Sequence, residues 1–451
     1  MFKSLMNALK VKEIRMKILF TLAMLALIRL GSAIPVPGMN TTVFKNWFQG
    51  LTESDAFGFM NRFTGGSFEN MSILALNITP YITSSIIIQL LTIAIPKFEE
   101  WQKDGEDGRK KLTKLTRYIT VALALIESIA MAIGFYRNTG FLTSQNPFLV
   151  VQIVAALTAG SAFLMWIGER ITENGVGNGI SIVLTINILS RMPSDISSLF
   201  GQFVSGKPIA RGVVSAIVII AVIIFMVVLV VLLNGAERRI PVQYAKKIQG
   251  RKTYGGNHSE IPLKVNTAGV MPIIFAMSLF QFPIIITQLV GYNGSGFWGK
   301  AVAFLNQSNW CNPNHPVYTL GLVVYILLLI FFAYFYTSIT FNPIEIADNM
   351  KKQGGFIPGI RPGKPTSEYL TSILNYIIFI GACGLIIIGV LPIVFNGLFG
   401  AKVSFGGTSL IIVVSVILET IKQIESRMLV RNYTGFLNSK GSSMKNSFLG
   451  Y

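Results

Sequence analysis

Ten apolar stretches divide this chain, and each is long enough to cross a lipid bilayer as an α-helix. Ionised side chains are rare within them, because a charge at the centre of a bilayer costs a few kcal/mol or more. Only 13% of the 451 residues are charged, whereas a soluble domain usually carries about 25%. The sequence therefore predicts an all-α polytopic membrane protein with ten transmembrane helices, at residues 18–34, 71–95, 118–136, 148–168, 176–193, 212–233, 266–290, 317–341, 370–395 and 407–427.

The basic residues lie in alternate loops, and this predicts the orientation. Loops rich in Lys and Arg stay on the cytoplasmic side of a membrane. With the N-terminus inside, 29 of the 38 Lys and Arg fall on internal segments and 8 on external ones. Both termini are therefore predicted to be cytoplasmic. The basic head before the first apolar stretch could also begin a secretory signal, but nine further spans and the lack of a clear cleavage site favour a membrane span.

Ten spans divide naturally into two halves of five helices. An odd number of spans per half places the halves in opposite orientation, the inverted-repeat arrangement of many transporters. The predicted organisation is a cytoplasmic N-terminus (1–17), an N-terminal half (18–193), an external hinge loop (194–211), a C-terminal half (212–427) with long cytoplasmic loops at 234–265 and 342–369, and a cytoplasmic tail (428–451).

Two ionisable residues stand clearly within the predicted spans. Arg29 is close to the external end of the first span, which favours snorkelling of its guanidinium to the interface. Glu127 is more central in the third span and needs a polar partner or a water-filled neighbour. Pro80 in the second span, and Pro272 and Pro283 in the seventh, predict kinked helices that are candidates for moving parts, although kinks can also be packing features.

The segment from Asp55 to Thr64 is apolar and aromatic but too short to cross a bilayer. Two glycines and the second span follow it. This pattern favours a short helix folded back into the protein from outside, because irregular backbone at membrane depth must be buried or line a cavity. An amphipathic helix lying on the membrane surface is the alternative.

The sequence offers no group for catalysis. It contains no GxxxxGK[ST] phosphate loop, no HExxH motif and no nucleophile beside a base. Two cysteines and two histidines far apart in the sequence indicate neither a disulfide framework nor a metal site. The GVGNG sequence at 175–179 opens a span rather than following a strand, so helix packing explains it better than phosphate binding. We predict no catalytic residue, no metal and no cofactor, and therefore no enzyme activity.

The two long internal loops carry clustered positive charge. The first has seven basic residues and little hydrophobic material to form a domain, and six of the seven lie close together: Arg238, Arg239, Lys246, Lys247, Arg251 and Lys252. The second contains Arg361 within GFIPGIRPGKPT, where proline and glycine stiffen and turn the backbone. A solvated loop explains any one of these charges. Together they suit an acidic partner or ribosomal RNA, bound largely through charge.

Seven stretches of the chain, in order and over almost its whole length, resemble the SecY family of bacterial protein-translocation channel subunits. They are NITPYITSSIIIQLL (77–91), GEDGRKKLTKLTRY (105–118), GERITENGVGNGIS (168–181), ERRIPVQYAKK (237–247), PLKVNTAGVMPIIFA (262–276), FNPIEIADNMKKQGGFIPGIRPGKPT (341–366) and GGTSLIIVVSV (406–416). These motifs are long and specific, and the chain is identified as a member of that family.

The resemblance implies an hourglass channel in the bacterial plasma membrane, built from two inverted five-helix halves and closed by a short plug helix. Such a channel passes unfolded secretory polypeptides outward and releases transmembrane segments sideways into membrane lipid. The implied partners are SecE, SecG, signal peptides and nascent polypeptides. The SecA ATPase or the translating ribosome, with a possible ribosomal RNA contact, supplies the energy.

The resemblance also implies which residues close the channel. The plug corresponds to residues 56–70 and includes Phe57, Phe59, Met60 and Phe63. An aliphatic ring at the constriction corresponds to Ile78, Ile82, Leu184, Ile188, Ile274 and Ile412. Isoleucine is common in the family where Leu184 stands, and the apolar character is kept. Branched aliphatic side chains resist wetting and yield to a peptide, although spacing alone would equally describe core residues.

The lateral gate and the docking surface follow from the same resemblance. Thr83 and Phe282 are expected to face one another across the gate between the second and third helices and the seventh and eighth. A polar cluster at the gate corresponds to Gln89, Glu127 and Asn266. The family commonly has a neutral amide where Glu127 stands, so a carboxylate there is expected to alter gate stability. Contacts to SecA or the ribosome correspond to Arg251, Lys252 and Arg361.

Two other classes of protein were weighed against this reading. An ion- or proton-coupled solute carrier usually places several charged or ion-coordinating groups at the membrane midplane. Here an aliphatic constriction is expected instead. A membrane-embedded hydrolase would need catalytic residues that the sequence does not offer.

Overall fold

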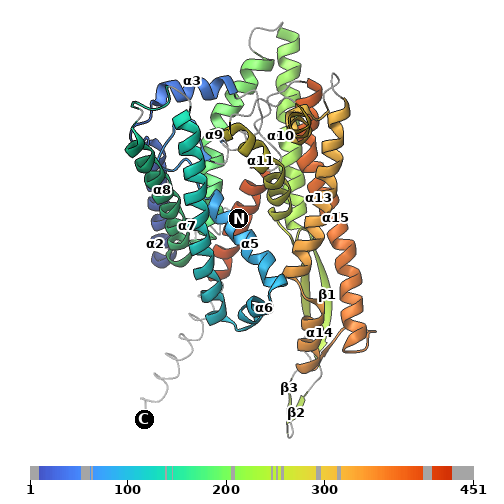
Figure 1. Cartoon of the computed structure of the whole chain (residues 1–451). Helices are drawn as coiled ribbons and strands as arrows, with labels where there is room; N and C mark the ends of the chain where they lie inside the picture. The colour runs from blue at the N-terminus through green and yellow to red at the C-terminus, as the bar shows by residue number, and fades with distance from the viewer. Residues whose placement is uncertain are drawn as a thin grey trace. The chain divides into compact units, whose positions relative to one another are not determined.

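The protein is described here by a computed structural model, dominated by helices (Figure 1). It describes residues 10–51, 61, 64–137, 140–144, 146–204, 209–244, 247–249, 252–254, 258–290, 296–311, 316–399 and 409–428. The chain divides into two compact units. The first comprises residues 1–193, 289–291 and 416–451, and the second comprises residues 194–288 and 292–415.

The first unit is built from helices that pack along one another. They are α2 (Lys12–Ala33), α3 (Thr41–Leu51), α5 (Thr79–Ala94), α6 (Pro96–Lys103), α7 (Glu106–Arg137), α8 (Pro147–Asn174) and the first part of α9 (Gly179–Phe203). Helix α7 packs against both α5 and α8. Hydroxyl pairs join these helices, with Ser84 to Thr120 at 2.6 Å and Ser128 to Thr158 at 2.9 Å. Such short polar contacts let helices pack closely where no water is present.

Aromatic rings form one end of the first unit's core. Phe44 of α3 is fully buried and contacts the rings of Phe68, Phe135 and Phe141 edge-on, with centroids 5.4–5.8 Å apart. Edge-to-face pairs of this kind add about 0.5–1.5 kcal/mol each beyond the burial of their area. The amphipathic helix α3 is thereby fixed to the segment around Phe68, which precedes α5.

The second unit combines long apolar helices with a small sheet. Its elements are the end of α9, α10 (Ile209–Gly235), β1 (Glu237–Tyr244), β2 (Lys247–Gln249), β3 (Lys252–Tyr254), β4 (His258–Lys264), α11 (Met271–Val290), α12 (Phe297–Leu305), η1 (Gln307–Asn309), η2 (Pro316–Thr319), α13 (Leu320–Thr340), α14 (Pro343–Lys352), β5 (Gly355–Phe356) and α15 (Lys364–Phe399). A further helix covers residues 409–428, of which residues 409–415 belong to this unit.

The two basic loops join in one three-stranded sheet of order β4-β1-β5. Strands β1 and β4 form an antiparallel hairpin, and β1 also pairs with β5, with Gln243 opposite Phe356. The first loop, which was expected to have little hydrophobic material to form a domain, contributes the two longer strands of this sheet. Ile240 and Val242 alternate along β1 and are buried with Leu263, Ile357 and other apolar side chains. The period-two spacing of a short strand is a weak signal among six charges.

Six segments among the described residues are long and apolar enough to span a membrane, and seven if the bent pair of α5 and α6 counts as one. Five of them contain α2, α7, α8, α10 and α15, and the sixth is Pro316–Lys352, which contains α13. On α10 the side chains of Val214, Ile217 and Leu232 are each more than 60% exposed. Apolar surface of this extent requires lipid or a partner to cover it. The protein is therefore a multi-pass membrane protein.

The boundaries of three predicted spans differ from the sequence reading. The second span was expected to begin at Met71, but helix α5 begins at Thr79, because Met71 and Asn77 adopt positive φ angles of 45° and 53°. Helix α5 then meets α6 at a bend of 103°. Helix α9 continues beyond Pro193 to Phe203, into the predicted external loop. Helix α11 begins only at Met271.

Two of the predicted proline kinks are helix starts instead. Pro80 and Pro272 lie in the first turns of α5 and α11, where the missing N–H has no intrahelical partner to lose. Pro283 does lie inside α11, as expected, and Pro193 lies inside α9.

The GVGNG sequence packs helices, as predicted. A Cβ on Gly179 would lie 1.9 Å from the carbonyl oxygen of Gly168 on the neighbouring helix. Asn178 caps α9 by accepting hydrogen bonds from the backbone N–H groups of Ile180 and Ser181. The glycines therefore allow α8 and α9 to approach one another closely.

Gly160→Ala on α8 should lower the unfolding free energy by about 1–3 kcal/mol, because overpacking forces the backbone to shift. A Cβ on Gly160 would lie 2.0 Å from the carbonyl oxygen of Ile73. The matched control is Gly201→Ala on α9, where a Cβ meets nothing within 4 Å. That control should be neutral or stabilising by up to about 1 kcal/mol through helix propensity. Thermal unfolding of the purified protein in detergent decides, and equal melting temperatures for the two variants would contradict the packing assigned to Gly160.

Candidate functional site

Four of the six residues assigned to the aliphatic ring lie in the first unit, on two helices. Ile78 caps α5 and Ile82 follows one turn later, with the Ile82 N–H bonded to the Ile78 carbonyl at 3.0 Å. Ile78 is fully buried in a core cluster that Ile82 packs against. Leu184 and Ile188 lie one turn apart on α9, and both are buried. Each pair therefore presents two aliphatic side chains on one helix face.

The other two ring residues belong to the second unit. Ile274 lies in the first turn of α11 and is half-buried. Ile412 lies in the helix at 409–428 and is buried. All six positions are aliphatic and none is fully exposed, which suits a constriction as well as it suits a core.

The residues assigned to the plug, Phe57, Phe59, Met60 and Phe63, lie outside the described residues. The described part of the plug segment, Asn61 and residues 64–70, is held by polar contacts. The Asn61 amide donates to the Glu69 carboxylate at 3.1 Å, and the Arg191 guanidinium on α9 donates to the same carboxylate oxygen at 2.6 Å. Burial raises the pKa of Glu69, but the Asn61 hydrogen bond and the attraction of Arg191 outweigh it and hold the pKa below its ordinary value.

Arg29 does not snorkel, contrary to the expectation from its position. Its guanidinium turns inward, donating to the Ser190 hydroxyl at 2.8 Å and to the amide oxygen of Asn187. Asn187 in turn donates to the amide oxygen of Asn77 at 3.0 Å, and Ser161 donates to the Asn77 carbonyl. These partners come from segments far apart in sequence, so only the fold could reveal them.

The residues assigned to the lateral gate do not form one cluster in the first unit. Thr83 is half-buried on α5 and bonds to the Thr79 carbonyl of its own helix. Helices α5 and α7 run in opposite directions on either side of α6 (Figure 1), with Ser84 against Thr120. Among the described residues no hydrogen bond joins Gln89 to Glu127.

Glu127 and Gln89 both lack a polar partner among the described residues. Glu127 is half-buried, and neither a hydrogen bond nor an ion pair to it is found in that part of the chain. The Oε1 atom of Gln89 is buried without a hydrogen bond. The sequence predicts a polar partner for Glu127, and no such partner is found among the described residues of the first unit.

Asn266 belongs to a polar chain that the sequence did not indicate. Its amide donates to the Oδ1 atom of Asn234 at 2.8 Å, and the Asn234 amide donates to the Ser415 hydroxyl at 2.8 Å. The chain joins the start of α11, the end of α10 and the helix at 409–428. Phe282 lies on α11, and its side chain is outside the described part of the structure.

Two of the three residues assigned to partner docking, Lys252 and Arg361, lie among the described residues. Arg251 is outside the described residues, and Lys252 begins β3, paired with Gln249 of β2. Within the second unit, Figure 1 places the β2–β3 hairpin beyond β1 and α14. Arg361 is exposed, and its backbone carbonyl accepts a hydrogen bond from the Thr366 hydroxyl at 2.8 Å. Among the described residues no carboxylate pairs with its guanidinium.

Arg361 lies in a turn whose backbone is held in place on both sides. Gly359 and Gly363 adopt φ angles of +84° and +102°, which favour glycine. Ile357 is buried against the sheet on one side of the turn, and Leu370 of α15 is buried on the other. On β1, Arg239 pairs with Glu237 at 2.7 Å, and this hydrogen bond and charge raise the pKa of Arg239. Arg238 beside it is exposed.

A second basic surface lies on the first turns of α7. A groove of about 580 Å³ is lined by Glu106, Arg109, Lys110, Thr113, Lys114, Arg117, Tyr118 and Glu173. Spacings of three and four residues bring these side chains to one side of the helix. Arg117 pairs with Glu169 at 2.7 Å, so part of the charge is neutralised.

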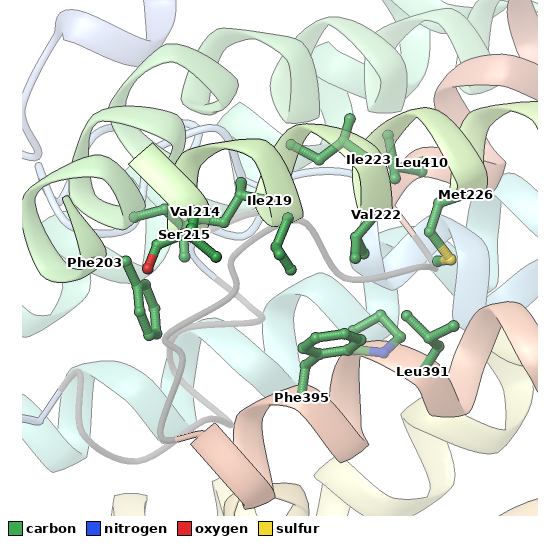
Figure 2. Close-up of a pocket in the computed structure, with 13 residues that line it drawn as sticks. Phe203, Val214, Ser215, Ile219, Val222, Ile223, Met226, Leu391, Phe395 and Leu410 are labelled. Carbon is green, nitrogen blue, oxygen red and sulfur yellow. The ribbon is translucent and has the colours of Figure 1, made fainter. Parts of the chain in front are cut away.

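The second unit also contains an apolar cavity of about 240 Å³, shown in Figure 2. Its lining comes from α9, α10, α15 and Leu410, and Ser215 is the one hydroxyl among thirteen residues. In Figure 2, Val222 and Met226 of α10 lie on the side that faces Leu391 of α15, whereas Ile223 lies near Leu410. A lining of this kind suits hydrocarbon and provides no acid or base for catalysis.

Comparison with known proteins gives a consistent result over nearly the whole chain. The family model described as SecY matches residues 72–421. The chain is 44% identical to the protein translocase subunit SecY of Bacillus licheniformis, over 97% of this chain and 100% of that protein. It is 43% identical to the protein translocase subunit SecY of Streptomyces galbus, with the same coverage.

Solved structures have the same fold at lower sequence identity. One, described as the structure of a protein conducting channel, covers 92% of this chain and 93% of its own, with a TM-score of 0.60 and 18% identity. Another has a TM-score of 0.61 with the same coverage and identity. Its description states that the plug domain of that SecY protein stabilises the closed state of the translocation channel and maintains a membrane seal. At 18% identity these neighbours establish the fold alone.

Asn266→Ala should lower the unfolding free energy by about 1–3 kcal/mol, because a buried acceptor on Asn234 loses its donor. Asn234→Ala removes the same bond, so the two substitutions combined should cost less than their sum. Equilibrium unfolding in mixed micelles measures the cycle. The control is Thr267→Ala, whose exposed hydroxyl bonds only to the nearby Lys264 carbonyl and should change stability less. Additive effects of Asn234→Ala and Asn266→Ala would contradict the polar chain.

Proposed function

The chain belongs to the SecY family of protein translocase subunits, and on that premise we propose that it conducts unfolded secretory polypeptides across the bacterial plasma membrane and releases transmembrane segments into lipid. The observation that carries the proposal is 44% identity to a SecY subunit over 97% of the chain. A fold similar to that of protein-conducting channels supports it independently. The protein is a channel subunit, and energy comes from a partner, SecA or the translating ribosome.

We propose the architecture of an hourglass with ten transmembrane helices in two inverted halves and both termini in the cytoplasm. Every one of the ten predicted spans contains a helix in the described residues, which supports this count. The basic loops that form the sheet would then face the cytoplasm, in agreement with the positive-inside rule. Residues 56–70 form the plug in this proposal. The hydrogen bonds of Glu69 with Asn61 and with Arg191 of α9 support the attachment of this segment to α9.

The constriction is proposed to be the aliphatic ring. Its six members are Ile78, Ile82, Leu184, Ile188, Ile274 and Ile412. Aliphatic side chains offer water no hydrogen bonds, so a narrow ring of them stays dry and blocks ions while deforming around a passing chain. Thr83 on α5 and Phe282 on α11 are proposed to flank the lateral gate, and Glu127 and Asn266 to line it.

Arg361 is proposed as the centre of the docking surface. Its unpaired charge, its exposure and its stiff turn favour attraction of an acidic or phosphate-bearing partner without loss of conformational freedom. Lys252 of β3 and Arg251, which lies outside the described residues, are proposed to contribute further positive charge to this docking. SecA and the ribosome are the proposed occupants, with ribosomal RNA among the contacts, and SecE and SecG complete the proposed membrane complex.

Arg361→Glu should reduce SecA-driven translocation by at least about tenfold, because charge reversal converts attraction into repulsion at the docking surface. The measurement is ATP-dependent protection of a secretory precursor from protease in vesicles containing this protein, SecE and SecG. Lys300→Glu on α12 makes the same change of charge on a predicted external segment and should leave protection unchanged. Full activity of the Arg361 variant would remove this residue from the docking surface.

Ile82→Asn combined with Ile412→Asn should raise ion conductance of the resting channel, because each amide makes the constriction easier to wet. Deletion of residues 56–64 should raise it further if plug and ring close the channel together. Conductance is recorded in planar bilayers without precursor. Ile217→Asn, a lipid-facing change on α10, is the control. If the double variant conducts no more than the parent protein, the constriction lies elsewhere.

A further inference from the structure

The apolar cavity of the second unit runs from the surface of α10 toward the core. Val214 and Val218 line it and are 61% and 47% exposed. Met226 and Leu410 also line it and are only 2% and 3% exposed. Figure 2 shows Leu410 and Met226 near one end of the cavity and Val214 at the other. The cavity is therefore open toward the surface at one end and closed at the other.

The cavity is elongated along a membrane span. The stretch of α10 from Val214 to Met226 that lines it is about 18 Å long at 1.5 Å per residue. The hydrocarbon core of a bilayer is about 30 Å thick, so each leaflet contributes about 15 Å. The open end lies little more than one turn after the start of α10 at Ile209. The cavity therefore follows the helix through a depth of about one leaflet.

A proline in α15 accounts for the gap between the two helices. Pro392 lies inside α15 and lines the cavity. A proline in a helix interior removes one backbone hydrogen bond, and its ring displaces the preceding turn. Leu391 beside it faces Val222 and Met226 of α10 across the cavity (Figure 2). The two apolar helices are therefore not closely packed at this level.

Water is a poor occupant of this cavity. Ser215 supplies the one hydroxyl among the thirteen lining residues. An internal water needs about two to four polar partners, and an apolar cavity of about 150 Å³ stays dry. The cavity here is larger, at about 240 Å³. An empty apolar cavity destabilises a protein in proportion to its volume, so a hydrocarbon occupant is favoured.

We propose that this cavity binds one acyl chain of a phospholipid, with the ester end of the chain at Val214 and its methyl end at Met226. The lipid enters from the leaflet beside the start of α10, which is the outer leaflet in the predicted orientation. A flexible hydrocarbon chain matches the lining in polarity and the cavity in length. The inference requires only a protein embedded in the membrane and does not rest on the proposed transport.

A positively charged residue lies near the open end of the cavity. Arg211 is in the first turn of α10, four residues before Ser215, which lines the cavity. Residues four apart share one face of a helix. Every phospholipid headgroup carries a negative phosphate, and arginine forms strong charge-assisted hydrogen bonds with phosphate. The position of Arg211 therefore suits a phospholipid whose chain enters at Val214.

Photo-crosslinking from within the acyl chain tests the proposal. The protein, together with SecE and SecG, is placed in vesicles of phosphatidylethanolamine and phosphatidylglycerol. One sample contains a trace of phosphatidylglycerol with a diazirine near the methyl end of one chain, and the other has the diazirine near the ester. Illumination and peptide mass spectrometry locate the adducts. The methyl-end probe should label Met226 and Leu410, and the ester-end probe should label Val214 and Phe203.

Met226 and Leu410 are the informative positions, because bulk lipid cannot reach side chains that are almost fully buried. Adducts confined to exposed side chains such as Ile217 would overturn the proposal. A reversed order of the two probes would also overturn it, because the chain would then enter from the other leaflet.

Filling the cavity should exclude the acyl chain. Val222→Trp should lower adduct formation at Met226 and Leu410 by at least about fivefold, because the indole takes up the space. The matched control is Ile220→Trp, which lies about 200° around α10 from Val222 and is 57% exposed. That control should leave the adducts unchanged. Unchanged adducts in Val222→Trp, at the melting temperature of the control, would show that the chain does not lie in the cavity. If Val222→Trp does not fold, the adducts of the parent protein decide.

Other occupants predict different results. A helix of the proposed partner SecE seated on the cavity would abolish adducts at Met226 when SecE is added to the protein alone. Residues 400–408 of this chain, which lie outside the described residues, would exclude lipid with or without SecE if they filled the cavity. Either result overturns the lipid site. Failure of precursor transport, by contrast, counts against the proposed function and leaves the lipid site unaffected.

Discussion

The cost of placing a polar group in hydrocarbon is the constraint on which this structure depends. Lipid offers no hydrogen bonds, so backbone that is not helical must be satisfied by the protein. Residues 65–78 are mostly turns rather than helix, and their backbone hydrogen bonds are made partly within the segment and partly with residues 34–36. Val36 donates to the Met71 carbonyl at 2.9 Å, and Ile73 donates to the Ile34 carbonyl at 3.0 Å. The segment before α5 is therefore stable only as part of the packed first unit.

The same constraint explains the polar chain around Arg29. A guanidinium that does not reach the lipid headgroups has no lipid acceptor, and here it takes an amide and a hydroxyl oxygen on α9. Asn187 can accept from Arg29 because its own amide is oriented by Asn77. Each bond thus fixes the geometry of the next, and such a network tends to break as a unit.

Periodicity and apolar length in the sequence predicted the helical class, a chain that crosses the membrane several times and the packing role of the glycines at 175–179. Features that depend on local backbone geometry or on distant contacts were not predicted. The second span was placed eight residues early because nothing in the run MSILALNI indicates that Met71 and Asn77 adopt positive φ. Arg29 was expected to reach the interface because its partners on α9 lie more than 150 residues away. Arg191, Glu69 and Asn234 went unrecognised because their importance arises only from contacts made on folding.

The sheet connects the two basic loops of the second unit into one folded element. Strand β1 follows α10, β4 leads toward α11, and β5 connects α14 to α15, so their pairing joins four helix ends through one set of backbone bonds. A shared apolar cluster stabilises this strand pairing, and it includes Ile240, Val242, Leu263 and Ile357. A partner that pushes on Arg361 therefore acts on a body rather than on a flexible loop. Because Asn234 at the end of α10 also bonds to Asn266 before α11 and to Ser415, force on the sheet reaches the ends of three helices through directional contacts.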